Sequence, residues 1–176
     1  MNRCAFALLL AALGGAAGCA PSEEGSLSWR GVDRLIERDF PDVESISADS
    51  LAAWLGDAGR VPPVLVDVRE AEEYAVSHLP GAVRIDPDAP ASALRDTLGR
   101  FGPGRAVVLY CSVGYRSARL AARFGTADRP VQNLDGSIFR WANEGRPVVR
   151  DGESVREVHP YDAVWGRLLS RDLRAR

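Results

Sequence analysis

The sequence predicts an α/β fold in which a central, mainly parallel sheet of five strands carries helices on both faces. The first observation is a set of short apolar runs rich in β-branched residues. They have the composition of buried parallel strands and lie at Val64–Val66, Ala106–Tyr110 and Val131–Leu134. The second is that segments with apolar residues at helical spacing separate these runs. Strands that alternate with helices are typical of the α/β class.

The 176-residue chain begins with a segment that resembles a bacterial secretory signal. A positive start is followed by an apolar run over residues 4–13, which is too short to span a bilayer. Ala16-Ala17-Gly18-Cys19 then resembles a lipobox, the motif whose cysteine receives a lipid. We therefore expect residues 1–18 to be a signal peptide and Cys19 to anchor the protein to a membrane. By resemblance to bacterial lipoproteins, Ala20 after it implies the outer membrane of a bacterial cell envelope, facing the periplasm. Simple cleavage to a soluble periplasmic protein is the alternative.

Residues 19–44 are expected to form a lipid-anchored tether and a short helix. The stretch from Pro21 to Ser28 is short, polar and glycine-containing, as expected of a tether. Apolar residues then recur at helical spacing until Pro41, and they are Val32, Leu35, Ile36 and Phe40. This pattern predicts a helix that packs on the domain, after which residues 42–46 lead into the first strand.

The main domain is expected to occupy residues 45–150. Ser47 is a candidate N-cap for a helix that places Leu51, Trp54 and Leu55 on one face, with Trp54 in the core. A further strand is predicted over residues 83–85. Further helices are predicted over residues 70–76, 93–98 and 120–124 and around Trp141.

Residues 151–176 form an extension beyond this domain. Val155 and Val158 lie in a segment that looks extended. The next apolar residues form a stripe at helical spacing, which predicts an amphipathic helix, and they are Val164, Trp165, Leu168, Leu169 and Leu173. We expect this helix to pack against the domain, and a partner-binding role is the alternative if the stripe is exposed.

Cys111 directly follows the central apolar run, and this position makes it a candidate catalytic residue. In α/β sheets, ligands bind at the edge formed by the carboxyl ends of the strands. The next residues can surround the sulfur with N–H groups, because Gly114 permits unusual backbone angles, and Arg116 adds a cation. Such surroundings favour the thiolate, which is the nucleophilic form. The alternative is a buried, inert thiol.

Composition limits the choice of partners. A net charge of −2 gives no indication of nucleic-acid binding. Loss of the signal peptide removes Cys4 and lipidation uses Cys19, which leaves Cys111 as the only free thiol and permits no internal disulfide. The two histidines, His78 and His159, suggest neither a Cys-His pair nor a metal cluster. A monomer is favoured.

Three stretches of the chain resemble the single-domain rhodaneses, the thiosulfate sulfurtransferase family. The segment from Cys111 to Ser117 resembles the active-site loop of this family. Two other stretches resemble its first and closing motifs and stand in the expected order. They are Leu65–Glu70 with Tyr74 and His78–Ala82, and Leu134–Ile138 with Trp141, Gly145 and Pro147–Val148. The resemblance covers residues 45–150 and implies a rhodanese-like fold. Ser137 stands where the family usually has a second glycine.

The resemblance also implies an activity. Rhodaneses carry sulfur as a cysteine persulfide, which here would form on Cys111 without any cofactor or metal. A donor such as thiosulfate would supply the sulfur, and a thiol or cyanide would accept it. Arg116 would hold the anionic donor, Arg69 would line the pocket, and Asp67 and His78 would support the structure around it. N–H groups along the loop would stabilise charge on the sulfur, and they belong to Ser112, Val113, Gly114, Tyr115 and Ser117.

Two other functions remain open at this point. Relatives of the rhodaneses that are phosphatases or arsenate reductases have a loop one residue longer, whereas four residues separate Cys111 from Arg116 here. This shorter loop favours sulfur transfer over phosphate chemistry. A noncatalytic or sulfur-carrier module that binds a partner in the envelope is the second alternative.

Overall fold

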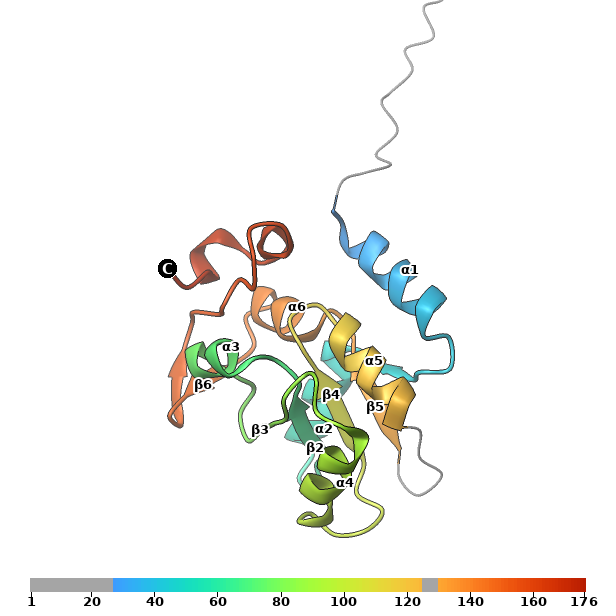
Figure 1. Ribbon diagram of the computed structural model, residues 1–176. Helices are drawn as coiled ribbons and strands as arrows, with labels where there is room; N and C mark the ends of the chain where they lie inside the picture. The colour runs from blue at the N-terminus through green and yellow to red at the C-terminus, as the bar shows by residue number, and fades with distance from the viewer. Residues whose placement is uncertain (1–26, 125–129) are drawn as a thin grey trace, which may run out of the picture.

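A computed structural model describes residues 27–124 and 130–176. Its centre is a sheet of five parallel strands in the order β1-β5-β4-β2-β3 (Figure 1), which confirms the predicted sheet. The strands are β1 (Ser45–Ile46), β2 (Val64–Asp67), β3 (Val83–Arg84), β4 (Val107–Tyr110) and β5 (Val131–Leu134). The central strands β2 and β4 are buried along their whole length, as their unbroken apolar runs predict.

Six helices connect and cover these strands within the described residues. They are α1 (Trp29–Asp39), α2 (Ala48–Gly56), α3 (Ala71–Val76), α4 (Ala91–Gly99), α5 (Tyr115–Phe124) and α6 (Ser137–Asn143). Side chains of β4 alternate between two hydrophobic clusters, because successive residues of a strand point to opposite faces of the sheet. Val108 and Tyr110 join the cluster that contains residues of α1, α2 and α6. Val107 and Leu109 join the cluster that contains residues of α4 and α5.

Helix α2 begins as predicted but buries less of its apolar face than expected. The Ser47 hydroxyl accepts the N–H of Ser50 at 3.1 Å, as an N-cap does. Leu51 is fully buried, whereas Trp54 is only partly buried at the edge of the core and Leu55 is exposed. The indole N–H of Trp54 donates to the carbonyl of Val61, so this side chain holds the loop between α2 and β2 instead of filling the core.

The C-terminal extension differs from the predicted amphipathic helix. Its one strand, β7 (Glu153–Val155), pairs antiparallel with β6 (Val148–Arg150) at the end of the domain. Two short 3₁₀ helices follow, η1 (Trp165–Leu168) and η2 (Arg171–Leu173). The side chain of Asn143 in α6 separates these two helices, because its amide donates to the carbonyl of Leu168 and its oxygen accepts the N–H of Ser170. Leu168, Leu169 and Leu173 are nevertheless buried in the core, so the extension packs against the domain.

The N-terminal predictions fall partly outside the described residues. The predicted signal peptide and Cys19 lie among residues 1–26, which are outside the described part of the chain. Helix α1 is observed where the apolar pattern places it, and Val32 and Ile36 are buried against the domain. None of the helices formed by residues 27–124 and 130–176 is both long enough and apolar enough to cross a membrane.

Replacing Leu169 with alanine tests whether the extension is part of the folded core. Because Leu169 is almost fully buried, we expect Leu169→Ala to lower the free energy of unfolding by about 2–5 kcal/mol. The exposed Val164 of the same segment provides the control, and Val164→Ala is expected to change stability by at most about 0.5 kcal/mol. Denaturant unfolding measures both. Equal, small effects would show that the extension contributes nothing to the core.

Candidate active site

Cys111 lies at the carboxyl end of β4, where the sequence predicts it. Its side chain is 1% exposed, and the N–H of Gly114 points at Sγ with a nitrogen–sulfur distance of 3.1 Å. Gly114 has a φ of +111°, a region that other residues rarely adopt. A Cβ at this position would also approach Cδ1 of Ile36 to 3.1 Å. The loop therefore needs glycine here, both for its backbone angles and for its contact with α1.

The surroundings of Cys111 favour the thiolate. Burial alone raises the pKa of the thiol. The positive charge of Arg116 acts in the opposite direction, as do the N–H groups of Ser117 and Gly114 and the hydroxyl of Ser117, and together they lower the pKa below its ordinary value. The Ser117 hydroxyl is itself held by Asn133, whose side-chain oxygen lies 2.6 Å away. Of the loop N–H groups that were expected to act on the sulfur, those of Gly114 and Ser117 do so here.

Ser137 fixes the start of the loop, a role that the sequence does not reveal. The N–H of Cys111 donates to the Ser137 hydroxyl at 3.1 Å, and this hydroxyl donates to the carbonyl of Leu134. The next two N–H groups of α6, from Ile138 and Phe139, bind the carbonyls of Cys111 and of the residue after it. Ser137 has a φ of +49°, in the region that favours glycine, and glycine is the residue that the resemblance leads one to expect here. The serine side chain adds a hydrogen bond that glycine cannot make.

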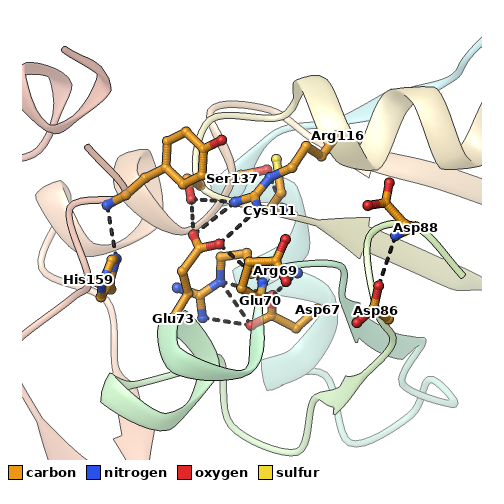
Figure 2. Close-up of polar contacts among 12 residues, drawn as sticks. Asp67, Arg69, Glu70, Glu73, Asp86, Asp88, Cys111, Arg116, Ser137 and His159 are labelled. Carbon is orange, nitrogen blue, oxygen red and sulfur yellow. Dashed lines mark hydrogen bonds and ion pairs between the residues drawn. The ribbon is translucent and has the colours of Figure 1, made fainter. Parts of the chain in front are cut away.

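Arg116 is paired with Glu73, the site residue that sequence reasoning missed. The two terminal nitrogens of Arg116 lie 2.7 and 2.8 Å from the two carboxylate oxygens of Glu73, a bidentate ion pair (Figure 2). The hydroxyl of Ser112 donates to the same carboxylate at 2.7 Å. Burial raises the pKa of Glu73, but the bonds from Arg116 and Ser112 outweigh it and lower the pKa below its ordinary value.

The sequence gives only an indirect signal for Glu73. Its carboxylate also accepts the N–H of Glu70 at the start of α3, which is the pattern of a capping box. A glutamate at this position is therefore explained by helix capping alone. The observation that identifies it is its burial, since the residue is 2% exposed and a buried carboxylate needs a cationic partner.

Arg69 does not line the pocket, although the sequence resemblance implies that it would. Its side chain is fully buried, and Nε and one terminal nitrogen donate to the Asp67 carboxylate, the latter at 2.6 Å. The same nitrogen donates to the carbonyl of Ser77. The Asp67 carboxylate also accepts the backbone N–H of Arg69, so the two residues form a local ion pair at the end of β2. Asp67 therefore has the structural position predicted for it, and Arg69 shares it.

His78 lies in the turn before β3, with contacts that are structural. Its Nδ1 is 3.2 Å from the carbonyl of Tyr74, and the two rings are stacked with centroids 3.9 Å apart. Its backbone pairs with Val149 of β6, which fastens the hairpin to the domain. Within the described residues, His, Cys, Asp and Glu side chains form no cluster of three or more that could hold a metal ion.

A cavity of about 290 Å³ opens beside Cys111. The loop and the start of α5 line one side of it, and Leu35 of α1 and two residues of the C-terminal extension line the other. The ring of Tyr161 lies over the Arg116 guanidinium, 4.6 Å from ring centre to carbon. The complete lining is Leu35, Cys111, Ser112, Val113, Tyr115, Arg116, Tyr161 and Trp165.

The pKa of Cys111 can be measured from the pH dependence of its alkylation by iodoacetamide, followed by intact mass. Because only the thiolate reacts, the midpoint is expected below the value of about 8.5 for a free cysteine. Arg116→Gln should move this midpoint to higher pH, since it removes the positive charge. Arg119→Gln, which removes an exposed charge from the same helix, should not. A midpoint that is the same in all three proteins would contradict the electrostatic role of Arg116.

Comparisons with known proteins place this site in a family. The profile of the Rhodanese-like domain matches residues 47–144, more than half of the chain. A sulfurtransferase of Allochromatium vinosum is 32% identical over 108 residues, which cover 61% of this chain and 95% of that protein. An HTH-type transcriptional regulator of Mycobacterium tuberculosis is 37% identical over 97 residues, 52% of this chain and 39% of the regulator.

A solved structure agrees with these relatives. The thiosulfate sulfurtransferase of Pseudomonas aeruginosa superimposes with a TM-score of 0.53 at 27% identity, over 70% of this chain and 23% of that one. The chain thus spans less than half the length of this enzyme and of the mycobacterial regulator. The matched region contains four of the five strands of the parallel sheet, β2 to β5, together with the Cys111 loop, Glu73 and Ser137. The chain therefore belongs to the rhodanese-like domain family.

Proposed function

We propose that the protein is a sulfurtransferase in which Cys111 carries sulfur as a persulfide. One observation carries this proposal: the Cys111 sulfur lines a cavity, accepts an N–H bond from its own loop and lies beside a fixed guanidinium. This arrangement favours a thiolate, which attacks sulfane sulfur directly and needs no general base. Similarity to proteins described as sulfurtransferases supports the same reaction class.

The proposed reaction has two displacement steps. The Cys111 thiolate attacks the outer sulfur of a donor such as thiosulfate. The sulfur–sulfur bond of the donor breaks, and sulfite leaves with the electron pair. A thiolate or cyanide then attacks the outer sulfur of the persulfide and regenerates the Cys111 thiolate. Charge on the outer sulfur is stabilised by the loop N–H groups and by Arg116, so that no resident cofactor is required.

We further propose that the protein acts as a monomer in the bacterial envelope, anchored through a lipid on Cys19. The support is the lipobox-like sequence and the short apolar run before it. Helix α1 begins ten residues after Cys19, so a short tether would keep the domain close to the membrane surface. Export would also leave Cys111 without a cysteine partner in the mature chain.

Intact mass spectrometry tests the persulfide. The chain from Ala20 onward retains every residue of the described fold and contains Cys111 as its only cysteine. Incubation with excess thiosulfate should add about 32 mass units, the mass of one sulfur atom, and cyanide should remove them. Cys111→Ser should show no gain. If the mass stays unchanged while iodoacetamide still labels Cys111, thiosulfate is not a donor. If polysulfide and an organic thiosulfonate also fail to load sulfur, the proposed function is wrong.

A further inference from the structure

The outer wall of the Cys111 cavity comes from segments that flank the family domain. Residues 47–144 match the family profile, yet Leu35 precedes this range and Tyr161 and Trp165 follow it. The matched region therefore supplies the reactive cysteine and its loop, whereas α1 and the C-terminal extension determine the shape of the space in front of it. Figure 1 shows α1 and the two 3₁₀ helices of the extension at the upper end of the domain, on either side of α6.

Local contacts hold the two aromatic wall residues in place. Tyr161 has a φ of +65°, a conformation that costs free energy for a bulky residue, and its N–H donates to Nδ1 of His159 at 3.1 Å. The Asp162 carboxylate accepts the N–H of Trp165 at 2.7 Å. Gly166 packs so closely on Pro160 that an added Cβ would come within 3.0 Å of it. These contacts give Tyr161 and Trp165 defined positions beside the cavity.

Helix α1 is fixed to the active-site loop from the other direction. The Tyr115 hydroxyl donates to the Asp39 carboxylate at 3.0 Å, and the rings of Phe40 and Tyr115 meet edge to face at 5.2 Å. Asp33 forms an ion pair with Arg140 of α6. These contacts seat Leu35 against the opening beside Cys111.

The charges of the cavity do not suit a small inorganic dianion. Within the described part of the chain, Arg116 is the one cationic side chain that lines this cavity, and both of its terminal nitrogens already donate to Glu73. The remaining walls are largely apolar and aromatic. A dianion entering this space would lose part of its hydration and find a cation whose terminal nitrogens are already paired with a carboxylate. A donor with a single charge next to its sulfur would lose less hydration free energy on entering the cavity.

The size of the cavity gives the same indication. Its volume is about 290 Å³, close to the lower end of the range of about 300–1,000 Å³ for small-molecule sites. A water molecule occupies about 30 Å³ in the liquid, and an inorganic sulfur anion needs only a few such volumes. Most of the cavity is therefore available to a carbon body, and its apolar walls would bury one favourably.

We propose that this cavity selects organic sulfur compounds, with an aryl or branched alkyl body and at most one negative charge beside the reactive sulfur, over donors with a small body, inorganic dianions included. This inference rests on the proposed persulfide chemistry. With an organic thiosulfonate, the Cys111 thiolate attacks the terminal sulfur and the sulfur–sulfur bond of the donor breaks. The sulfinate leaves with the electron pair, and no oxidant or reductant is consumed. Leu35, Tyr161 and Trp165 are the residues that confer the preference.

Two donors that differ only in their body test this selectivity. Benzenethiosulfonate and methanethiosulfonate are both monoanions with the same transferable sulfur. Persulfide formation on the chain from Ala20 onward is followed by intact mass, and the rate ratio of the two donors is divided by the same ratio measured with free cysteine. This division removes the difference in their intrinsic reactivity. We expect a corrected preference for the benzene compound on the order of tenfold or more.

Variants of the wall identify the source of the preference. Tyr161→Ala and Trp165→Ala should each reduce the corrected ratio several-fold, because loading from benzenethiosulfonate should fall more than loading from methanethiosulfonate. Leu35→Ala tests the same effect from α1. The exposed neighbour Val164, which does not line this cavity, provides the control variant Val164→Ala and should leave the ratio unchanged.

The outcomes separate the two proposals. If neither the thiosulfonates nor thiosulfate load Cys111, the proposed function itself fails. If thiosulfate alone loads it, the selectivity is overturned. If both load and the corrected ratio is close to one, the selectivity is overturned while the persulfide chemistry stands. Equal loss of both donors in all three wall variants would also overturn it, because the wall would then support the loop without selecting a body.

Discussion

The active site depends on the buried carboxylate of Glu73. It receives two bonds from Arg116 and one each from Ser112 and Glu70, and so it joins the start of α3 to both ends of the Cys111 loop. A buried pair of this kind adds little net stability, but removing one partner typically costs about 3–5 kcal/mol, because the other charge is left unpaired. The pair therefore fixes the position of the Arg116 cation, which is one of the groups that lower the pKa of Cys111.

The site reflects a balance between burial and charge. Full burial protects the sulfur from solvent and raises the pKa of the thiol, whereas a dry environment also strengthens each compensating interaction. The loop supplies that compensation with N–H groups held by glycine geometry and by the hydroxyls of Ser117 and Ser137. The flanking segments add a further wall, since Leu35, Tyr161 and Trp165 line the cavity beside Cys111.

Sequence reasoning predicted the elements whose signals are local. The apolar runs identified β2, β4 and β5, Ser47 identified the start of α2, and the position after β4 identified Cys111. Glu73 escaped it because the contact with Arg116 joins residues 43 positions apart, and no local pattern records such a contact. The apolar stripe after Val164 predicted one helix, yet Asn143 of α6 divides the segment into two 3₁₀ helices by binding both sides of the break. The prediction that Arg69 lines the pocket was wrong for a related reason. A charged side chain at the edge of a sheet can equally point inward and pair with a neighbouring carboxylate, here that of Asp67.

The most direct test of this account is a crystal structure of the protein after reaction with a sulfur donor. We expect one additional sulfur atom bonded to Sγ of Cys111 and directed into the cavity. The loop N–H groups should surround that sulfur, and Arg116 should remain paired with Glu73. An unmodified Cys111 beside a sulfur compound bound elsewhere would contradict the central claim. So would a persulfide that forms only after the loop has opened and the pair between Arg116 and Glu73 has broken.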